Sequence, residues 1–422
     1  MARIVLNPFG SLGDLHPYLA LAVELQRRGH EAVIATSEVY RKKIGGEGVR
    51  FAAVAPNVAE FLEDPDMLAR LWDPRKGTEY LFREFLIPRV RQAFEDLRPV
   101  CEGAELLLTH MGALAGPLVA QKLSIRWLSV VLQPAGFFSR YEPFVIAEAP
   151  WLRHGHRLGR WFQSLLLTLG DRRTNEWAKP IHTLREELGL AAGKNLIMAG
   201  QFSPWGTLAL FSRHFAKPQP DWPPHVSQPG FLFFDNEADA AIRERLQSFL
   251  KGGPTPLLFT LGSSAVLEPG NFFEQSRRAA EILGIRAILL AGQETASITS
   301  SSDLLVLPYV PFQEVMPHVA AVVHQGGIGT LAQTLRAGRP ALVVPWSHDQ
   351  PDNAYRLERL GVARVLGRGQ YRAERVAREL RRLLETSQMR ARAQELGAAL
   401  RQENAVPLAA NAVEAALTRN TG

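Results

Sequence analysis

A glycine-rich turn at residues 326–329 lies between a short apolar run and a segment with helical periodicity. The apolar run, residues 320–324, ends in His324, and Thr330 opens the segment 330–337. Glycines let a backbone approach an anion closely, and a helix N-terminus offers free N–H groups and the positive end of the helix dipole. With the imidazole of His324 and the hydroxyl of Thr330, this pattern predicts a cradle for a diphosphate. The turn consists of Gly326, Gly327, Ile328 and Gly329.

A second polar pair, Asp349 and Gln350, comes after the next predicted strand, residues 341–344. A carboxylate beside an amide supplies the acceptors and donors that suit sugar hydroxyls. Taken alone, the glycine turn is equally typical of an ordinary connection between a strand and a helix. The polar pair at the end of the neighbouring strand favours a ligand site.

The candidate for a general base lies near the N-terminus. Asp14 follows Gly13, between a strand that ends near Asn7 and a helix predicted over residues 17–28. An aspartate just before a helix is also a good N-cap, so capping is the competing interpretation. His16 is the rival base, because its intrinsic pKa lies closer to neutrality. His110, after the predicted strand 105–109, is a possible partner for Asp14, although a backbone contact explains it equally well.

Aromatic side chains are frequent in the first half of the chain, and they predict an apolar wall for a second substrate. Most aromatic residues at such positions belong to a core, so each one alone is weak support. The predicted wall comprises Phe9, Trp72, Phe82, Phe85, Phe137 and Phe138, with Trp151 and Trp161 as further candidates.

Strands alternate with helices along most of the chain, which predicts an α/β protein with parallel, doubly wound sheets. Four prolines between residues 218 and 224 interrupt the pattern and indicate a linker. We therefore expect an N-terminal Rossmann-like domain at 1–216, a linker at 217–229, a C-terminal Rossmann-like domain at 230–400 and a final helix within 401–422. Ligands of open α/β sheets bind at the carboxyl ends of the strands, which predicts a cleft between the two halves.

The composition is that of a globular protein. Of the 422 residues, 46% are hydrophobic and 21% are charged, and the formal charge of +6 suits an anionic ligand better than nucleic acid. A single cysteine, Cys101, fits a reducing cytoplasm. No uncharged apolar stretch approaches the roughly 20 residues that span a bilayer. The basic run at residues 153–160 suggests a weak peripheral contact with an anionic membrane, although a solvated basic face explains it more simply.

Residues 309–360 resemble the nucleotide-sugar signature of family 1 glycosyltransferases, in particular the bacterial branch with glycopeptide-antibiotic, sterol and rhamnolipid-type enzymes. The resemblance implies a GT-B fold and places the nucleotide base against Tyr309 and Val310. It also implies that Asp14, at the position of the family's base, activates the acceptor. The donor site it implies comprises Gly13, Ser263, Ser264, Tyr309, Val310, His324, Gly326, Gly327, Ile328, Gly329, Thr330, Trp346, Asp349 and Gln350.

The signature departs from the family pattern at two positions. Many members place a ribose-binding glutamate where this chain has Ala332, and Gln333 is the neighbour that can substitute for it. Plant members stack the base on a tryptophan where this chain has Tyr309. The choice between UDP-sugar and dTDP-sugar donors therefore stays open.

The resemblance implies a direct displacement that inverts the anomeric centre and transfers a hexose to a small apolar acceptor of flavonoid, polyketide, sterol or lipid type. Neither a metal nor another cofactor is expected, because helix N-termini and His324 stabilise the departing diphosphate. The residues Asp64 and Asp66 match an Asp-x-Asp metal motif only by coincidence. The alternatives are a nucleotide-sugar epimerase and a non-catalytic glycosyltransferase partner; a dehydrogenase lacks support, since no G-x-G-x-x-G follows the first strand.

Overall fold

The computed structural model describes residues 1–142, 144–146, 152 and 159–419. The chain divides into two compact units: unit 1 contains Met1–Phe234 and Asn404–Gly422, and unit 2 contains Asp235–Glu403. The proline-rich stretch predicted as a linker thus falls inside unit 1. The final helix α17, Ala405–Thr418, also belongs to unit 1, although the whole of unit 2 precedes it in the chain.

Within the described residues, unit 1 has a seven-stranded sheet in the order β3-β2-β1-β4-β5-β6-β7, with every strand pair parallel. A parallel sheet must be covered on both faces, and the inner strands of this one are accordingly mostly apolar and buried, whereas the edge strands β3 and β7 are partly exposed. The strands are β1 Arg3–Asn7, β2 Glu31–Thr36, β3 Arg50–Ala53, β4 Leu106–His110, β5 Arg126–Val131, β6 Thr207–Ala209 and β7 Val226–Ser227. The helices include α1 Leu12–Arg27, α2 Arg41–Gly46, α3 Glu60–Glu63, α4 Pro65–Leu71, α5 Gly77–Tyr80, α6 Val90–Cys101, α7 Gly116–Leu123, α8 Gly159–Trp177 and α9 Lys179–Glu187.

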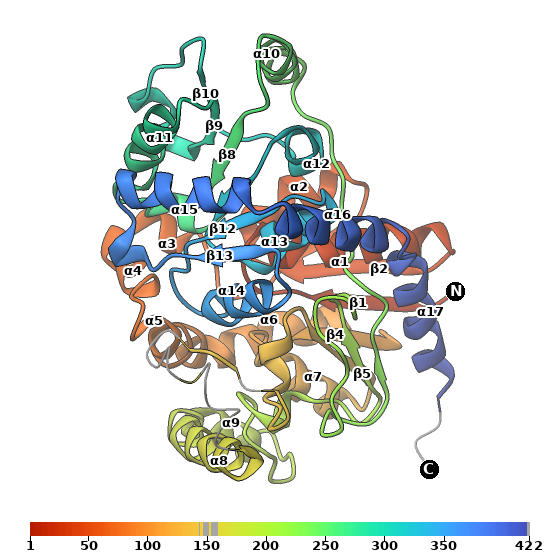
Figure 1. Ribbon diagram of the computed structural model, residues 1–422. Coiled ribbons are helices and arrows are strands. Elements are labelled where there is room, and N and C mark those ends of the chain that lie inside the picture. The colour runs from red at the N-terminus through yellow and green to blue at the C-terminus, as the bar shows by residue number, and fades with distance from the viewer. Residues whose placement is uncertain (143, 147–151, 153–158, 420–422) are drawn as a thin grey trace. The chain divides into compact units, whose positions relative to one another are not determined.

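The described part of unit 2 has a six-stranded parallel sheet in the order β10-β9-β8-β11-β12-β13 (Figure 1). Its strands are β8 Leu257–Thr260, β9 Ala287–Leu290, β10 Leu304–Leu307, β11 Val322–His324, β12 Ala341–Val343 and β13 Ala363–Val365. Its α-helices are α10 Ala240–Lys251, α11 Phe272–Leu283, α12 Phe312–Val315, α13 Ile328–Arg336, α14 Gln350–Arg359, α15 Ala373–Glu385 and α16 Ser387–Arg401. The predicted doubly wound α/β class is confirmed.

The first helix begins at Leu12, five residues before the predicted start at Pro17, so that prediction was wrong. The side chain of Ser11 caps the helix by accepting from the N–H of Gly13, and the Asp14 carboxylate accepts from the N–H of Ser11. This capping box starts the helix early. Pro17 is therefore inside the helix, where it cannot donate to the carbonyl four residues before it.

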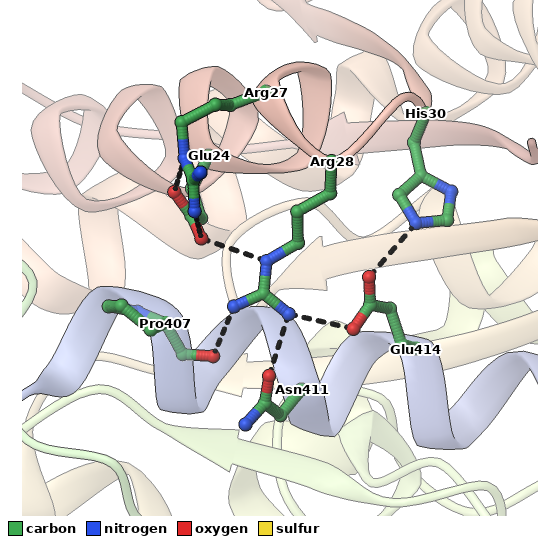
Figure 2. A network of polar contacts seen from close by, with 7 residues as sticks. All are labelled: Glu24, Arg27, Arg28, His30, Pro407, Asn411 and Glu414. Carbon is green, nitrogen blue, oxygen red and sulfur yellow. Dashed lines mark hydrogen bonds and ion pairs between the residues drawn. The ribbon is translucent and has the colours of Figure 1, made fainter.

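Arg28, directly after α1, ties the C-terminal helix α17 to the first helix (Figure 2). Its guanidinium donates to the Glu24 carboxylate at 2.8 Å and, on α17, to Asn411 Oδ1 at 2.6 Å, Glu414 Oε2 at 2.7 Å and the Pro407 carbonyl at 3.0 Å. Arg28 is only 18% exposed, and the planar guanidinium fork suits such a set of acceptors.

His30 adds a second link between the start of unit 1 and α17. Its Nδ1 accepts from the N–H of Ala2 at 3.3 Å, which leaves the proton on Nε2. Nε2 lies 3.2 Å from Glu414 Oε1 and donates to it in this tautomer. The imidazole thus contacts both neighbours.

We expect Arg28→Ala to loosen α17. The substitution removes four hydrogen bonds, three of them to α17, and the loss of hydrogen bonds to charged groups costs about 1.5–3 kcal/mol. Hydrogen exchange of the amides of residues 405–418 should therefore speed up by about tenfold or more in the variant.

Arg27→Ala is the matched control, because Arg27 is 69% exposed and, within the described ranges, its side chain bonds only Glu24. Exposed ion pairs contribute about 1 kcal/mol or less. Equal protection of α17 in the two variants would show that Arg28 does not hold this helix.

Candidate functional site

The glycine turn predicted from the sequence connects β11 to α13 in unit 2. His324, the last residue of β11, is fully buried, and its Nδ1 accepts the N–H of Gly326 at 3.0 Å. Burial lowers the pKa of His324 to about 3, so the imidazole is neutral and carries its proton on Nε2. Nε2 has no hydrogen-bond partner among the described residues. The site thus holds a neutral, unused N–H donor.

The N-terminus of α13 adds a positive dipole end to this donor. Gly327 is the N-cap, and no side chain of the described residues caps the helix. Gly326 has a φ of +91°, and a Cβ there would lie 3.0 Å from Val343 Cγ1 and 3.2 Å from the Gln350 carbonyl oxygen. Only glycine fits this position, and the turn leaves the first N–H groups of α13 available to an anion.

The loop after β8 lies directly against this turn. A Cβ on Gly262, whose φ is +67°, would lie 2.4 Å from Gln325 Nε2 and 3.0 Å from Thr330 Oγ1. Two of the predicted donor-binding segments therefore meet, with Ser263 exposed and Ser264 half-buried beside them. Sequence reasoning missed Gln325, a buried residue within the turn whose Oε1 is unpartnered among the described atoms.

Asp349 is joined to the glycine turn through Asn353. The Asn353 side chain is fully buried, and its Nδ2 donates to Asp349 Oδ2 at 2.6 Å and to the Gly326 carbonyl at 2.9 Å. His348 next to Asp349 has a φ of +58°, which is strained for a side chain of this kind. Asn353 was not predicted as a site residue.

The side chains of Gln350 and Trp346 mainly contact other residues of unit 2. Gln350 is buried, and its Oε1 accepts the backbone N–H of Trp346 at 2.8 Å, which leaves the NH₂ group for other contacts. The Trp346 ring is 3% exposed, edge-on to Phe272 and under the guanidinium of Arg368. The Trp346 ring therefore packs in the core of unit 2.

Tyr309 and Val310 lie at the carboxyl end of β10. Val310 belongs to the buried cluster of unit 2, whereas Tyr309 is 43% exposed and bonds the side chain of Asn236. Partial burial raises the pKa of Tyr309. Ala332 is buried inside α13, and Gln333 beside it is only half-buried. Of these two, Gln333 is the more exposed.

In unit 1, Asp14 is the third residue of α1, and the helix N-cap is Ser11 instead. The backbone N–H of Ser11 donates to Asp14 Oδ2 at 2.8 Å, and the Ser11 hydroxyl lies 3.3 Å away from the same oxygen. Burial nevertheless dominates and raises the pKa of Asp14 from 3.8 to about 6. Burial, with a smaller contribution from the Asp14 charge, raises the pKa values of Tyr18 and Tyr40.

The pKa of His16 is shifted in the opposite direction from that of Asp14. Burial, with a smaller contribution from the charge of Lys43, lowers the pKa of His16 to about 4. The His16 ring lies 5.6 Å from the ring of Phe234, and its Nε2 is unpartnered in the described part of the chain. The intrinsic advantage of histidine as a base near neutrality is thus reversed in the folded protein.

His110 repeats in unit 1 the arrangement of His324 in unit 2. It ends β4, and its Nδ1 accepts the N–H of Gly112 at 3.1 Å. Burial lowers the pKa of His110 to about 4, and Nε2 has no partner within the described residues. His110 is therefore a neutral N–H donor, which can hold an oxygen but is poorly suited to take up a proton.

A mainly apolar hollow lies at the carboxyl ends of β1, β2 and β3 in unit 1. Phe9 lines it, together with groups from the loop after β4 and from α6. Its lining residues are Asn7, Pro8, Phe9, Thr36, Ser37, Val54, Ala55, Pro56, Leu86, Val90, Ala93, Gly112, Ala113, Leu114 and Ala115.

The other aromatic residues predicted for the wall are distributed differently. Trp72, Phe85 and Phe137 are buried, whereas Phe82 and Phe138 are half-buried. Phe137 stacks on Trp222 with ring centroids 4.0 Å apart, so it belongs to the core. Trp151 and most of the basic run, residues 153–158, lie outside the described residues.

The Asp-x-Asp match at Asp64 has a structural explanation. Asp64 is the N-cap of α4 and accepts the N–H groups of Asp66 and Met67. Among the described residues, no group of three or more His, Cys, Asp or Glu side chains is arranged to hold a metal ion. No helix in the described ranges is long and apolar enough to cross a membrane.

Two family models match the chain. The C-terminal domain of the erythromycin biosynthesis protein CIII-like family matches residues 287–415, and the N-terminal domain of glycosyltransferase family 28 matches residues 4–98. A 6-deoxyallosyltransferase of O-mycaminosyltylonolide from Streptomyces fradiae is 30% identical over 99% of both chains. A sterol 3-beta-glucosyltransferase from Leptosphaeria maculans is 26% identical over 99% of this chain, which spans 29% of that longer protein.

Solved structures agree on the fold. The glycosyltransferase of kitacinnamycin superposes with a TM-score of 0.72 at 19% identity, covering 98% of this chain and 99% of that one. Glycosyltransferase VinC in complex with dTDP superposes with a TM-score of 0.68 at 20% identity, covering 99% of this chain and 100% of that one. The two α/β units have the architecture of GT-B glycosyltransferases.

The protein is a glycosyltransferase. More particularly, the chain belongs to the family 1 glycosyltransferases, and the resemblance found in the sequence is confirmed. Neither the epimerase nor the non-catalytic alternative is needed to account for it.

Proposed function

We propose that this enzyme transfers a hexose from a dTDP-sugar or UDP-sugar to a hydroxyl of a small apolar acceptor, without a metal and with inversion at the anomeric carbon. The observation that carries the proposal is the turn of unit 2. A neutral imidazole N–H, an uncapped helix N-terminus and the loop after β8 come together there around Gly326. Such a set of donors stabilises a diphosphate as it departs with its charge.

Asp14 is the proposed general base. It takes the proton from the acceptor hydroxyl, whose oxygen then attacks the anomeric carbon while the bond to the diphosphate breaks. Direct attack from the face opposite the leaving group turns an α-linked donor into a β-glycoside. His110, as a neutral donor, holds an acceptor oxygen or the Asp14 carboxylate and does not take the proton.

The apolar hollow of unit 1 is the proposed place for the acceptor. Its mainly apolar lining suits an apolar part of the acceptor, and the relatives named above act on O-mycaminosyltylonolide and on a sterol. The dTDP complex of VinC supports dTDP as a donor nucleotide, alongside UDP. Tyr309 is the exposed ring against which either base can lie.

The pH dependence of kcat/KM should identify the base. Only ionised Asp14 can accept a proton, so activity is expected to fall about tenfold per pH unit below about 6, where this carboxylate protonates. Asp14→Asn should lower kcat/KM by about 10²–10⁴-fold and abolish this acidic limb. His16→Ala should retain the limb. A limb near pH 4 that disappears in His16→Ala would instead identify the histidine.

The Asp14→Asn variant is expected to fold. The folded-state pKa of Asp14 lies above its unfolded value of 3.8, so ionisation between pH 4 and 6 destabilises the native protein. The amide oxygen can still accept the N–H of Ser11, and a buried charge is removed. The variant should therefore melt at or above the wild-type temperature at pH 7, which separates loss of catalysis from loss of structure.

The donor site is tested by thermal stabilisation with UDP and with dTDP, each with and without magnesium. A ligand at a hundred times its dissociation constant adds about 2.7 kcal/mol to stability. Metal-independent stabilisation is expected for at least one nucleotide and should be lost in Gly326→Ala. Gly361→Ala is the matched control, because Gly361 also has a positive φ of +71° but no atom near its missing Cβ. No response of the wild type to either nucleotide would contradict the proposed site.

A peripheral membrane contact is a further part of the proposal. Helix α8 exposes Trp161, Leu165 and Leu169 at intervals of four residues, which places them along one face of the helix. Two exposed arginines of the same helix, Arg160 and Arg172, flank these apolar residues. A tryptophan with leucines and arginines suits the interface of an anionic bilayer.

Sedimentation with vesicles of phosphatidylglycerol and phosphatidylcholine tests this contact. The wild type should sediment with the vesicles, and the double variant Trp161→Ser, Leu165→Ser should sediment several-fold less. Ile282→Ser, which removes a 47% exposed side chain of unit 2, serves as the control and should bind like the wild type. Wild-type protein that stays in the supernatant would rule the contact out.

A further inference from the structure

Asn353 connects the two halves of the proposed donor site. It is the fourth residue of α14, is fully buried, and donates through Nδ2 to both Asp349 Oδ2 and the Gly326 carbonyl. Asp349 precedes α14, and Gly326 follows β11. Neighbouring strands of the sheet therefore place the two acceptors on either side of one amide group.

The peptide groups on both sides of Gly326 are fixed by side chains. Its N–H donates to His324 Nδ1, and its carbonyl accepts from Asn353. A continuous chain of hydrogen bonds thus runs from the imidazole of His324 through Gly326 and Asn353 to the carboxylate of Asp349. The imidazole end serves the diphosphate in the proposed function, and the carboxylate end serves the sugar.

We propose that Asn353 is a positioning residue that sets the orientation of the Asp349 carboxylate relative to the diphosphate turn, so that the sugar is held in register with its leaving group. The inference rests on the proposed function. Asn353 is buried away from solvent and acts through its two acceptors. At 2.6 Å, its contact with Asp349 is short and charge-assisted, which holds one carboxylate oxygen in a fixed direction.

A merely structural role for Asn353 predicts something different. If its amide only stabilised the turn, its loss would weaken binding of the free nucleoside diphosphate and of the nucleotide-sugar by the same factor. If the amide orients Asp349, its removal weakens binding of the nucleotide-sugar more than binding of the free nucleoside diphosphate. The ratio of the two affinities separates these roles.

The experiment compares dTDP with dTDP-glucose, and UDP with UDP-glucose, by calorimetry on the wild type and on Asn353→Ser. Serine is smaller and cannot bridge both acceptors. We expect affinity for the nucleoside diphosphate to change less than about threefold, and affinity for the nucleotide-sugar to fall by tenfold or more, as for a lost hydrogen bond to a charged group. Hydrolysis or transfer assays should show kcat falling as well, since the sugar is misaligned.

Asn195→Ser is the matched control. Asn195 is also a buried asparagine, and its amide bridges Asp171 and Thr174 in unit 1. This variant should lose a similar amount of thermal stability but keep the wild-type ratio of affinities. A changed ratio in both variants would mean that general loosening, and not Asn353, affects the sugar.

A double-mutant cycle with Asp349→Ala covers the case in which Asn353→Ser destabilises the turn itself. If Asn353 acts through Asp349, the second substitution changes the affinity ratio no further in the Asp349→Ala background. Equal loss for nucleotide and nucleotide-sugar, or full additivity in the cycle, would overturn the inference. Failure of the wild type to bind any of the four ligands would instead contradict the proposed function.

Discussion

The parallel pairing of the strands in both sheets is the constraint on which the other features depend. Parallel strands end at the same edge of their sheet. In unit 1 the loops after β1 and β4 therefore lie at one edge, and in unit 2 the loops after β8, β11 and β12 do so. Because both faces of such a sheet must be covered, its strands are almost entirely apolar, and polar groups enter mainly at strand ends. His110 and His324 are the last residues of their strands and are buried for this reason.

The two histidines show how burial and one backbone hydrogen bond define a chemical role. The N–H of the residue two positions later occupies Nδ1, and the apolar surroundings keep the ring neutral. Each unit thus gains a donor whose protonation does not change near neutral pH. Asp14 is shifted in the opposite direction by the same desolvation, because the charged form of a carboxyl is the basic one. Environments that separate the pKa values of neighbouring groups assign them different roles.

Long apolar runs were the part of the fold that the sequence predicted best. The strands predicted at 320–324 and 341–344 are Val322–His324 and Ala341–Val343, and the helix predicted within 401–422 is Ala405–Thr418, since hydrophobic periodicity decides such segments. The start of α1 was missed because Pro17 was given more weight than the capping pattern of Ser11 and Asp14. The short strand Val226–Ser227 was missed because it follows a run of prolines and is held only by its neighbour β6.

The composition of the site was more predictable than its internal connections. The glycine turn, the loop after β8 with Ser263 and Ser264, and the pair Asp349 and Gln350 can be recognised from residue types and spacing. The turn and the loop lie in contact. The role of Asn353 depends on a contact across 27 residues, and the low basicity of His16 depends on its surroundings. Neither is encoded in local spacing.

The attachment of α17 to α1 affects how the protein is made. A ribosome releases the first 234 residues, then the whole of unit 2, and only afterwards the helix that Arg28 binds. During synthesis unit 1 therefore lacks the acceptors of Arg28 on α17 until unit 2 has been made. Unit 2 has its complete sequence earlier and can fold first. A helix that is synthesised after unit 2 thus completes unit 1.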